Sequence, residues 1–249
     1  MKKFSFILLV MVLIISNTYS QKDSTKAENP ISISCDLMSR YVWRGADLGT
    51  APSIQPGIEY NKSGFAIGVW GAYAINFQGY QESDFYLGYK FYKDMFSVLI
   101  TDYYFQSDLA SQNYFDYKKE TTGHVLETTF SFNGTEKLPL SVMIAANVYG
   151  ADAKKINDDG TVGNIQFSTY TELGYSLKYL NAFLGINLTK ADTDRGESGY
   201  FGDEVGIINL GISTTKNIKI TKSFTLPLTV SVITNPQAKK IYFVAGISL

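Results

Sequence analysis

The last strand of the chain constrains its fold more than any other segment. Between positions 241 and 249 every second residue is apolar, and the residues between them are smaller or more polar overall; the apolar set is Ile241, Phe243, Ala245, Ile247 and Leu249. Alternation with period two over about nine residues is the length and pattern of a tilted membrane-spanning β-strand. A soluble strand with one buried face alternates in the same way. Other features of the sequence are therefore needed to distinguish a membrane-spanning strand from a soluble one.

Residues 1–20 have the organisation of a secretory signal peptide. Met1-Lys2-Lys3 is a basic start, the run 4–15 is almost purely apolar, and small residues precede a cleavage point before Gln21. That run is too short to cross a bilayer as a helix. The sequence therefore predicts three segments: a cleaved signal peptide over 1–20, a periplasmic lead-in over 21–30 and a folded domain over 31–249.

Composition narrows the class of protein further. Aromatic residues make up 14% of the chain, with 18 Tyr and 16 Phe. Both types favour strands, and Tyr also favours membrane–water interfaces. Hydrophobic residues are an ordinary 45% of the chain, as expected of strands with one face toward lipid and one toward a polar interior. The net charge of −1 argues against a nucleic-acid partner, and the single cysteine, Cys35, excludes an internal disulfide.

Period-two alternation predicts about twelve strands. They fall near 31–44, 53–60, 65–75, 83–92, 95–105, 121–132, 138–149, 165–179, 182–189, 203–213, 223–234 and 240–249. Short connections rich in Asn, Gly and Asp alternate with longer polar stretches at 45–52, 76–82, 106–120, 150–164 and 190–202. The segment 214–222 fits this alternation least well, because it should be a short turn.

The alternation of connection lengths is typical of outer-membrane barrels, which have tight periplasmic turns and longer outer loops. A β-sandwich, the alternative all-β architecture, has no reason for it. Lipid also demands a closed sheet, since an open edge leaves backbone groups unsatisfied in hydrocarbon. The predicted fold is all-β: a closed antiparallel transmembrane β-barrel of about 12 strands, with both chain ends on the periplasmic side.

Residues 39–71 resemble a known protein family. The segment Ser39-Arg40-Tyr41-Val42-Trp43-Arg44-Gly45 is followed by Pro52-Ser53-Ile54-Gln55 and, after a turn, by Gly68-Val69-Trp70. These segments are similar to the S/D-x-Y-x-x-R-G, P-x-x-Q and G-x-W motifs of the TorF-type porin family, also called Gcw_chp proteins. The resemblance covers roughly the first three strands. It implies a small closed outer-membrane barrel with a channel function, and it brings no established substrate and no catalytic residues. The family usually ends on an aromatic residue, and Leu249 takes that place here.

Charged residues on the first two strands predict a cluster inside the barrel. Asp36, Arg40 and Arg44 are four residues apart and share the polar face of the first strand. Glu59 lies with Gln55 on the polar face of the second. Charges near the bilayer centre should point away from lipid, and in an antiparallel hairpin the two polar faces coincide. We therefore expect Arg44 to meet Glu59, and Arg40 to behave similarly with Glu59 or Asp36 as its partner.

Two interpretations of this lumen charge cluster remain open. A charged constriction would set conductance and ion preference. A salt-bridged plug would instead fill a narrow lumen and stabilise the barrel, because charges of opposite sign can neutralise one another. Further carboxylates on the polar faces of later strands could take part in either; they are Glu127, Glu172 and Glu204.

The sequence offers little for catalysis or for a cofactor. His124 is the sole histidine, and it shares its register with the apolar residues that follow, which places it near a strand end on the outer face. No serine spacing ties a nucleophile to it, and Cys35 reads as a small lipid-facing or packed side chain. Two acidic loop segments, 157–160 and 190–204, carry oxygen ligands that could hold Ca²⁺ or bridge through it to lipopolysaccharide. Neither matches the EF-hand spacing, and both are more simply explained as solvated loops.

The sequence therefore predicts an outer-membrane protein of a Gram-negative bacterium that passively passes ions or small polar solutes. The expected partners are outer-membrane lipids, lipopolysaccharide and the barrel-assembly machinery; no cofactor is expected. One alternative is a structural or adhesive barrel with a closed lumen, whose extracellular loops bind partners. A barrel enzyme that acts on lipids is the other, and it would have to use His124.

Overall fold

A computed structural model describes residues 29–49, 51–76, 81–106 and 113–249, and it is an all-β protein. The predicted signal peptide over 1–20, and the lead-in as far as residue 28, lie outside the described residues. Within the described part of the chain, no helix is long and apolar enough to cross a membrane.

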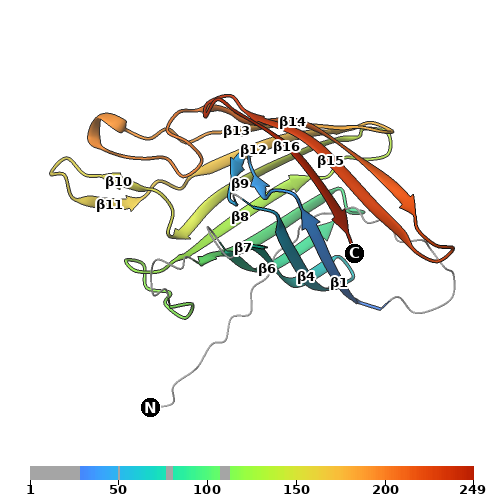
Figure 1. Ribbon diagram of the computed structural model, residues 1–249. Coiled ribbons are helices and arrows are strands. Elements are labelled where there is room, and N and C mark those ends of the chain that lie inside the picture. The colour runs from blue at the N-terminus through green and yellow to red at the C-terminus, as the bar shows by residue number, and fades with distance from the viewer. Residues whose placement is uncertain (1–28, 50, 77–80, 107–112) are drawn as a thin grey trace, which may run out of the picture.

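Twelve strands of the described chain close into an antiparallel barrel (Figure 1). They are β1 (Ile31–Met38), β4 (Ser53–Lys62), β5 (Phe65–Ala74), β6 (Gln81–Phe91), β7 (Phe96–Gln106), β8 (His124–Phe132), β9 (Leu140–Gly150), β12 (Thr169–Ser176), β13 (Asn181–Asn187), β14 (Gly206–Lys219), β15 (Thr225–Asn235) and β16 (Lys240–Ser248). Each pairs with its neighbour in this series, and β1 pairs with β16. The predicted fold class and strand number are confirmed.

Each strand has an outward face of mainly apolar, exposed side chains and an inward face that carries buried polar side chains. On β8, for example, Glu127 and Thr129 are buried in the interior, whereas Phe130 points outward and is exposed. The other strands sort in the same way. Outward-facing apolar side chains include Ile33, Ile58, Val98, Ile144, Leu173, Ile212 and Phe243. Inward-facing buried polar side chains include Gln55, Glu82, Asp84, Thr101, Asn147, Asn187 and Asn209.

The last strand closes the barrel against the first. Leu37 of β1 lies opposite Ile247 of β16, and the backbone of Cys35 exchanges hydrogen bonds with that of Leu249. The apolar register that the sequence indicated faces outward, with Phe243 71% exposed, while Val244 points inward and is buried. This seam removes the two sheet edges that an open sheet would leave unpaired.

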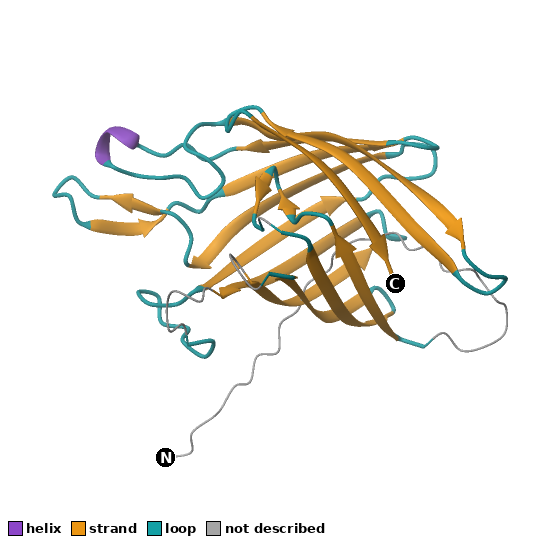
Figure 2. Cartoon of the chain, in the orientation of Figure 1, coloured by secondary structure: helices purple, strands orange, loops and turns teal. Residues whose placement is uncertain are grey.

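Five short turns lie at one end of the barrel, called here the turn end, and the long connections lie at the other, the loop end, together with the four-residue turn 236–239 between β15 and β16. The small hairpin of β10 (Lys154–Ile156) and β11 (Val162–Ile165) and the 3-10 helix η1 (Thr193–Arg195) project at the loop end (Figure 2). The poorly fitting segment 214–222 is mostly not a connection, because β14 continues to Lys219 and leaves only a short turn before β15.

Two predicted strands are shorter in the structure. The strand expected over 165–179 breaks at Phe167, whose φ is 55°, so that β11 and β12 are separate. The strand expected over 31–44 ends at Met38. The chain then turns into a second small hairpin, β2 (Val42–Trp43) with β3 (Ala46–Asp47). Arg40 and Arg44 therefore do not lie on a barrel strand.

Candidate functional site

The connection between β1 and β4 folds back into the barrel from the loop end. Arg44 and Gly45 form the tip of its hairpin, and both have positive φ, at 48° and 76°. A two-residue turn with this backbone favours Asn-Gly, because most side chains resist positive φ. Arg44 therefore holds a strained conformation that contacts elsewhere in the barrel must maintain.

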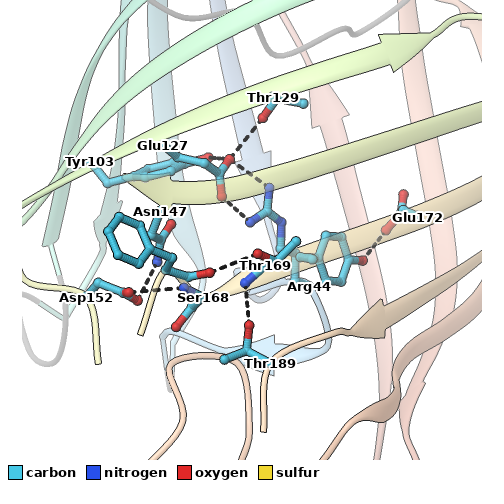
Figure 3. A network of polar contacts seen from close by, with 12 residues as sticks. Arg44, Tyr103, Glu127, Thr129, Asn147, Asp152, Ser168, Thr169, Glu172 and Thr189 are labelled. Atoms are coloured by element: carbon cyan, nitrogen blue, oxygen red, sulfur yellow. Dashed lines mark hydrogen bonds and ion pairs between the residues drawn. The ribbon is translucent and has the colours of Figure 1, made fainter. Parts of the chain in front are cut away.

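The main contact of Arg44 is a buried ion pair with Glu127 on the barrel wall (Figure 3). Its Nη1 donates to Glu127 Oε2 at 2.5 Å and its Nη2 to Oε1 at 2.9 Å. The side chains are only 7% and 1% exposed. Tyr103 and Thr129 also donate to Glu127 Oε1, at 3.2 and 3.1 Å. The carboxylate is thus enclosed by donors, and the pair links the hairpin to β8.

Aromatic rings enclose the guanidinium. Its central carbon lies 4.5 Å from the ring centre of Tyr170, 4.6 Å from Trp43 and 5.2 Å from Phe201. Burial alone would lower the pKa of Arg44, but the Glu127 carboxylate outweighs it and holds that pKa above its ordinary value. Arg44 therefore stays charged, and cation–π contact adds to its attachment.

Gly45 allows the hairpin tip to approach the wall closely. A Cβ at this position would lie 1.9 Å from the backbone oxygen of Ile208, where β14 is irregular in its pairing with β13. On the other side, the Asn235 amide donates to the Gly45 carbonyl oxygen at 3.2 Å. The two residues at the hairpin tip therefore have different roles. Arg44 has a side chain long enough to reach Glu127, and Gly45 has no Cβ that would collide with β14.

The connection from β13 to β14 packs against the hairpin at the loop end, through Tyr200 and Phe201. The amide of Asn187 donates to the carbonyl oxygens of Thr189, Gly202 and Glu204 at 2.8, 2.8 and 2.9 Å, which fixes the return of this loop. Phe201 is thereby brought against Trp43, with ring centres 5.8 Å apart. The hairpin and this loop therefore pack against each other at the loop end.

Below the hairpin lies a chamber of about 340 Å³. Its wall consists of inward-facing residues of β1, β4 to β7 and β13 to β16, and its roof is the segment 40–43. Glu82 and Asp84 of β6 are 1% and 6% exposed, and Asp84 lines the chamber. Burial and these two carboxylates raise the pKa of Tyr41 well above its ordinary value.

The structure separates the four residues of the predicted charge cluster. Arg44 does not meet Glu59; it pairs with Glu127, because the hairpin carries it across the lumen. Arg40 pairs with neither Asp36 nor Glu59 but with Asp47 of its own hairpin, at 2.5 Å. Glu59 lies nearer the turn end, where Asn61 donates to it at 3.3 Å.

Asp36 and the later carboxylates occupy separate places. Asp36 pairs through its backbone with Gln55 of β4, in the register that faces inward. Glu172 accepts hydrogen bonds from Tyr170 and, at 2.9 Å, from Asn209. Glu204 is an exposed loop residue that pairs with Lys190 at 2.8 Å. Of the carboxylates expected on later strands, Glu127 alone is joined to Arg44.

The strand expected over 31–44 would put Tyr41 and Trp43 on its apolar face with Ile31 and Ile33, whereas in the structure both residues follow the end of β1 and line the chamber inside the barrel. Their apolar alternation continues that of β1, so the pattern alone gives no break. Gly45 is the residue that could have indicated the break, because glycine is common in turns and uncommon within strands.

His124 is in the outward register of β8, as predicted, yet it is only 1% exposed. The connection between β7 and β8 covers it: Tyr117 stacks on the imidazole with ring centres 4.0 Å apart. Nδ1 faces Asp102 Oδ1 at 2.9 Å and Nε2 faces the Tyr114 carbonyl oxygen at 2.7 Å. Both partners are acceptors, and only a doubly protonated ring donates to both. The Tyr117 hydroxyl also donates to Asp102 at 2.8 Å.

We expect His124→Ala to release the covering segment 113–122 from the barrel wall. The substitution removes the contacts of the imidazole with Asp102 and with the Tyr114 carbonyl oxygen, and it leaves Tyr117 as the side-chain donor to the buried Asp102. Trypsin should then cut after Lys118 and Lys119 about tenfold faster, which corresponds to the loss of one charge-assisted contact. Adding Asp102→Asn should restore part of the protection. Unchanged cleavage in His124→Ala would contradict this role.

The two acidic loop segments lie together at the loop end, where their carboxylates have partners. Arg195 pairs with Asp158 of one segment and with Asp192 of its own, the latter at 3.0 Å. Glu197 accepts backbone hydrogen bonds from Ile156 and Asp192, both at 2.9 Å. Among the described residues, no group of three or more His, Cys, Asp or Glu side chains is arranged to hold a metal ion.

One protein family matches the chain. A family model described as "Bacterial protein of unknown function (Gcw_chp)" matches residues 23–208. This range includes the inward hairpin of β2 and β3, Glu127 and the connection between β13 and β14, and it ends within β14. No curated protein matches the chain.

Proposed function

The chain belongs to the Gcw_chp family of bacterial proteins of unknown function, and we propose that it is an outer-membrane β-barrel that passes ions or small polar solutes when its inward hairpin moves. The Gcw_chp resemblance seen in the sequence is thus confirmed, whereas the porin function that it implied is part of this proposal.

The outward face supports a place in a membrane. Large apolar side chains are exposed on barrel strands all around the molecule, which a soluble protein avoids. Exposed aromatic residues gather near the turn end, as at membrane–water interfaces; they are Tyr60, Phe65, Tyr89, Tyr92, Phe130, Tyr175, Tyr179 and Phe224. A closed sheet with this surface fits the outer membrane, where the barrel-assembly machinery and lipopolysaccharide would be its partners.

The chamber is the observation that carries the proposal for passage. A small barrel with a purely structural role can fill its interior with side chains, yet this one keeps about 340 Å³ beneath the hairpin. The buried Asp84 faces this chamber without a basic partner among the described residues, and the adjacent carboxyl group of Glu82 adds no positive charge, a costly arrangement unless water or a solute reaches Asp84. An interior of this kind is suited to small polar solutes.

The hairpin is the proposed gate. It is a separate element that crosses the lumen and is attached by the Arg44–Glu127 pair and by the contact of Gly45 with β14. The same buried ion pair favours the second candidate function, a permanently closed structural or adhesive barrel whose loops bind partners. The two candidates differ in one property, which is whether a folded barrel conducts when the hairpin is removed.

We expect the purified wild-type barrel to give rare current steps in planar bilayers, and a variant with residues 40–48 replaced by a Gly-Ser linker to conduct steadily. The linker removes both attachments while the strands remain. The matched control replaces residues 154–165, a hairpin that projects away from the lumen, and should behave like the wild type. Heat-modifiable migration on a gel checks folding. A folded 40–48 variant without current would reject passage and favour the closed barrel.

A further inference from the structure

The ionisable acid and base that line the chamber beneath the hairpin are Asp84 and Arg40. Arg40 is the cation in its lining, and Asp47 neutralises it at 2.5 Å. Asp84 has no basic partner of this kind among the described residues: its Oδ1 is buried without a hydrogen bond of ordinary geometry, and its near neighbour on β6 is the equally buried carboxyl group of Glu82, which interacts with Asp84 and with the Tyr41 hydroxyl. A buried carboxylate is costly unless a cation compensates it. The chamber is therefore electrostatically suited to a cation.

Several aromatic rings line the chamber together with Asp84. Tyr41, Trp43, Trp70 and Tyr103 all line the chamber. Tyr41 meets Trp70 edge to face with ring centres 5.6 Å apart, and Trp43 meets Tyr103 at 5.3 Å. Ring faces attract organic cations, and the combination of several rings with a carboxylate recognises quaternary ammonium groups. A strongly hydrated metal ion would instead need oxygen ligands in number.

We propose that this chamber binds a small organic ammonium ion, with Asp84 as the counter-charge and the rings around Trp43 and Trp70 as the cage. The inference rests on the proposed passage function, because a solute has to reach the chamber. It also names the class of solute that would be retained there. The roof of the cage belongs to the hairpin, so a bound ammonium would contact the gate directly.

The chain contains two tryptophans, Trp43 and Trp70, and both line the chamber, which provides a direct readout. We expect choline chloride to change the tryptophan fluorescence of the folded barrel in detergent in a saturable way. The neutral isostere 3,3-dimethylbutan-1-ol, and sodium chloride at the same concentration, should not. Asp84→Asn should weaken choline binding about tenfold or more, since a charge-assisted contact is lost. Glu136→Gln, which removes one charge from an exposed turn, should leave it unchanged.

Three results would overturn the inference. A folded wild-type barrel without a saturable response has no such site. An equal response to the neutral alcohol means apolar binding only, and an equal response to sodium chloride means an effect of ionic strength. Because these comparisons use the wild type, they hold even where Asp84→Asn fails to fold. A barrel that binds choline but never conducts rejects passage and keeps the site, whereas one that conducts without binding choline rejects the site alone.

Discussion

Arg44→Ala should lower the free energy of unfolding by about 3–5 kcal/mol, the range for breaking one partner of a buried ion pair. The substitution leaves the Glu127 carboxylate, which is 1% exposed, without its counter-charge. It also removes one of the two attachments of the hairpin tip, while the contacts of Gly45 with β14 and Asn235 remain. Urea unfolding in lipid vesicles, followed by tryptophan fluorescence, measures the loss. In a conducting barrel the same substitution should shift ion preference toward cations, because a positive charge leaves the lumen wall.

The double variant Arg44→Ala, Glu127→Gln should recover part of that stability, because the neutral amide no longer needs a counter-charge. Arg195→Ala is the matched control: it removes the same side chain from an exposed ion pair with Asp158. Solvent screens such pairs, so the barrel should unfold almost as the wild type does. An Arg44→Ala variant as stable as Arg195→Ala would show that the Glu127 contact contributes nothing.

Gly45→Ala should displace the hairpin and raise the steady conductance of the barrel. The new Cβ would lie 1.9 Å from the Ile208 carbonyl oxygen, and because the neighbouring atoms are backbone atoms of Ile208 and Asn209, they have little room to move. Overpacking of this kind costs about 1–3 kcal/mol, which we expect to appear as a loosened gate rather than an unfolded barrel. Current recording in planar bilayers and heat-modifiable migration on a gel separate these two results.

Gly160→Ala provides a closely matched control. Its φ of 79° is nearly that of Gly45, but a Cβ at position 160 meets nothing within 4 Å. Both substitutions therefore carry the same backbone strain, and only Gly45→Ala adds the overlap with β14. Equal conductance in the two variants would mean that close approach to Ile208 does not hold the hairpin in place.

The period-two pattern predicted the barrel because the strands have an apolar outward face and a more polar inward face. Residues such as Ile33 and Phe243 point outward, while Glu127 and Thr129 on β8 point inward, and no soluble packing is needed to explain either face. The predicted ends of strands were less accurate where the alternation of apolar and polar residues faded gradually along the chain. The residues after position 213 are mostly polar, with Ile218 and Ile220 as exceptions, so the sequence predicted a connection, whereas backbone pairing with β15 continues β14 to Lys219.

The sequence by itself determined the all-β class, about twelve strands, the outward register of the last strand and the presence of opposite charges on polar faces. Only the tertiary structure decided which charges meet. Arg44 and Glu127 are 83 positions apart, and their contact depends on barrel closure and on a hairpin that leaves the wall. Tyr41 and Trp43 continue the apolar alternation of β1 and still lie inside. An alternating pattern indicates only which side chains are kept away from water. It does not distinguish an outward face from side chains that pack inside the barrel.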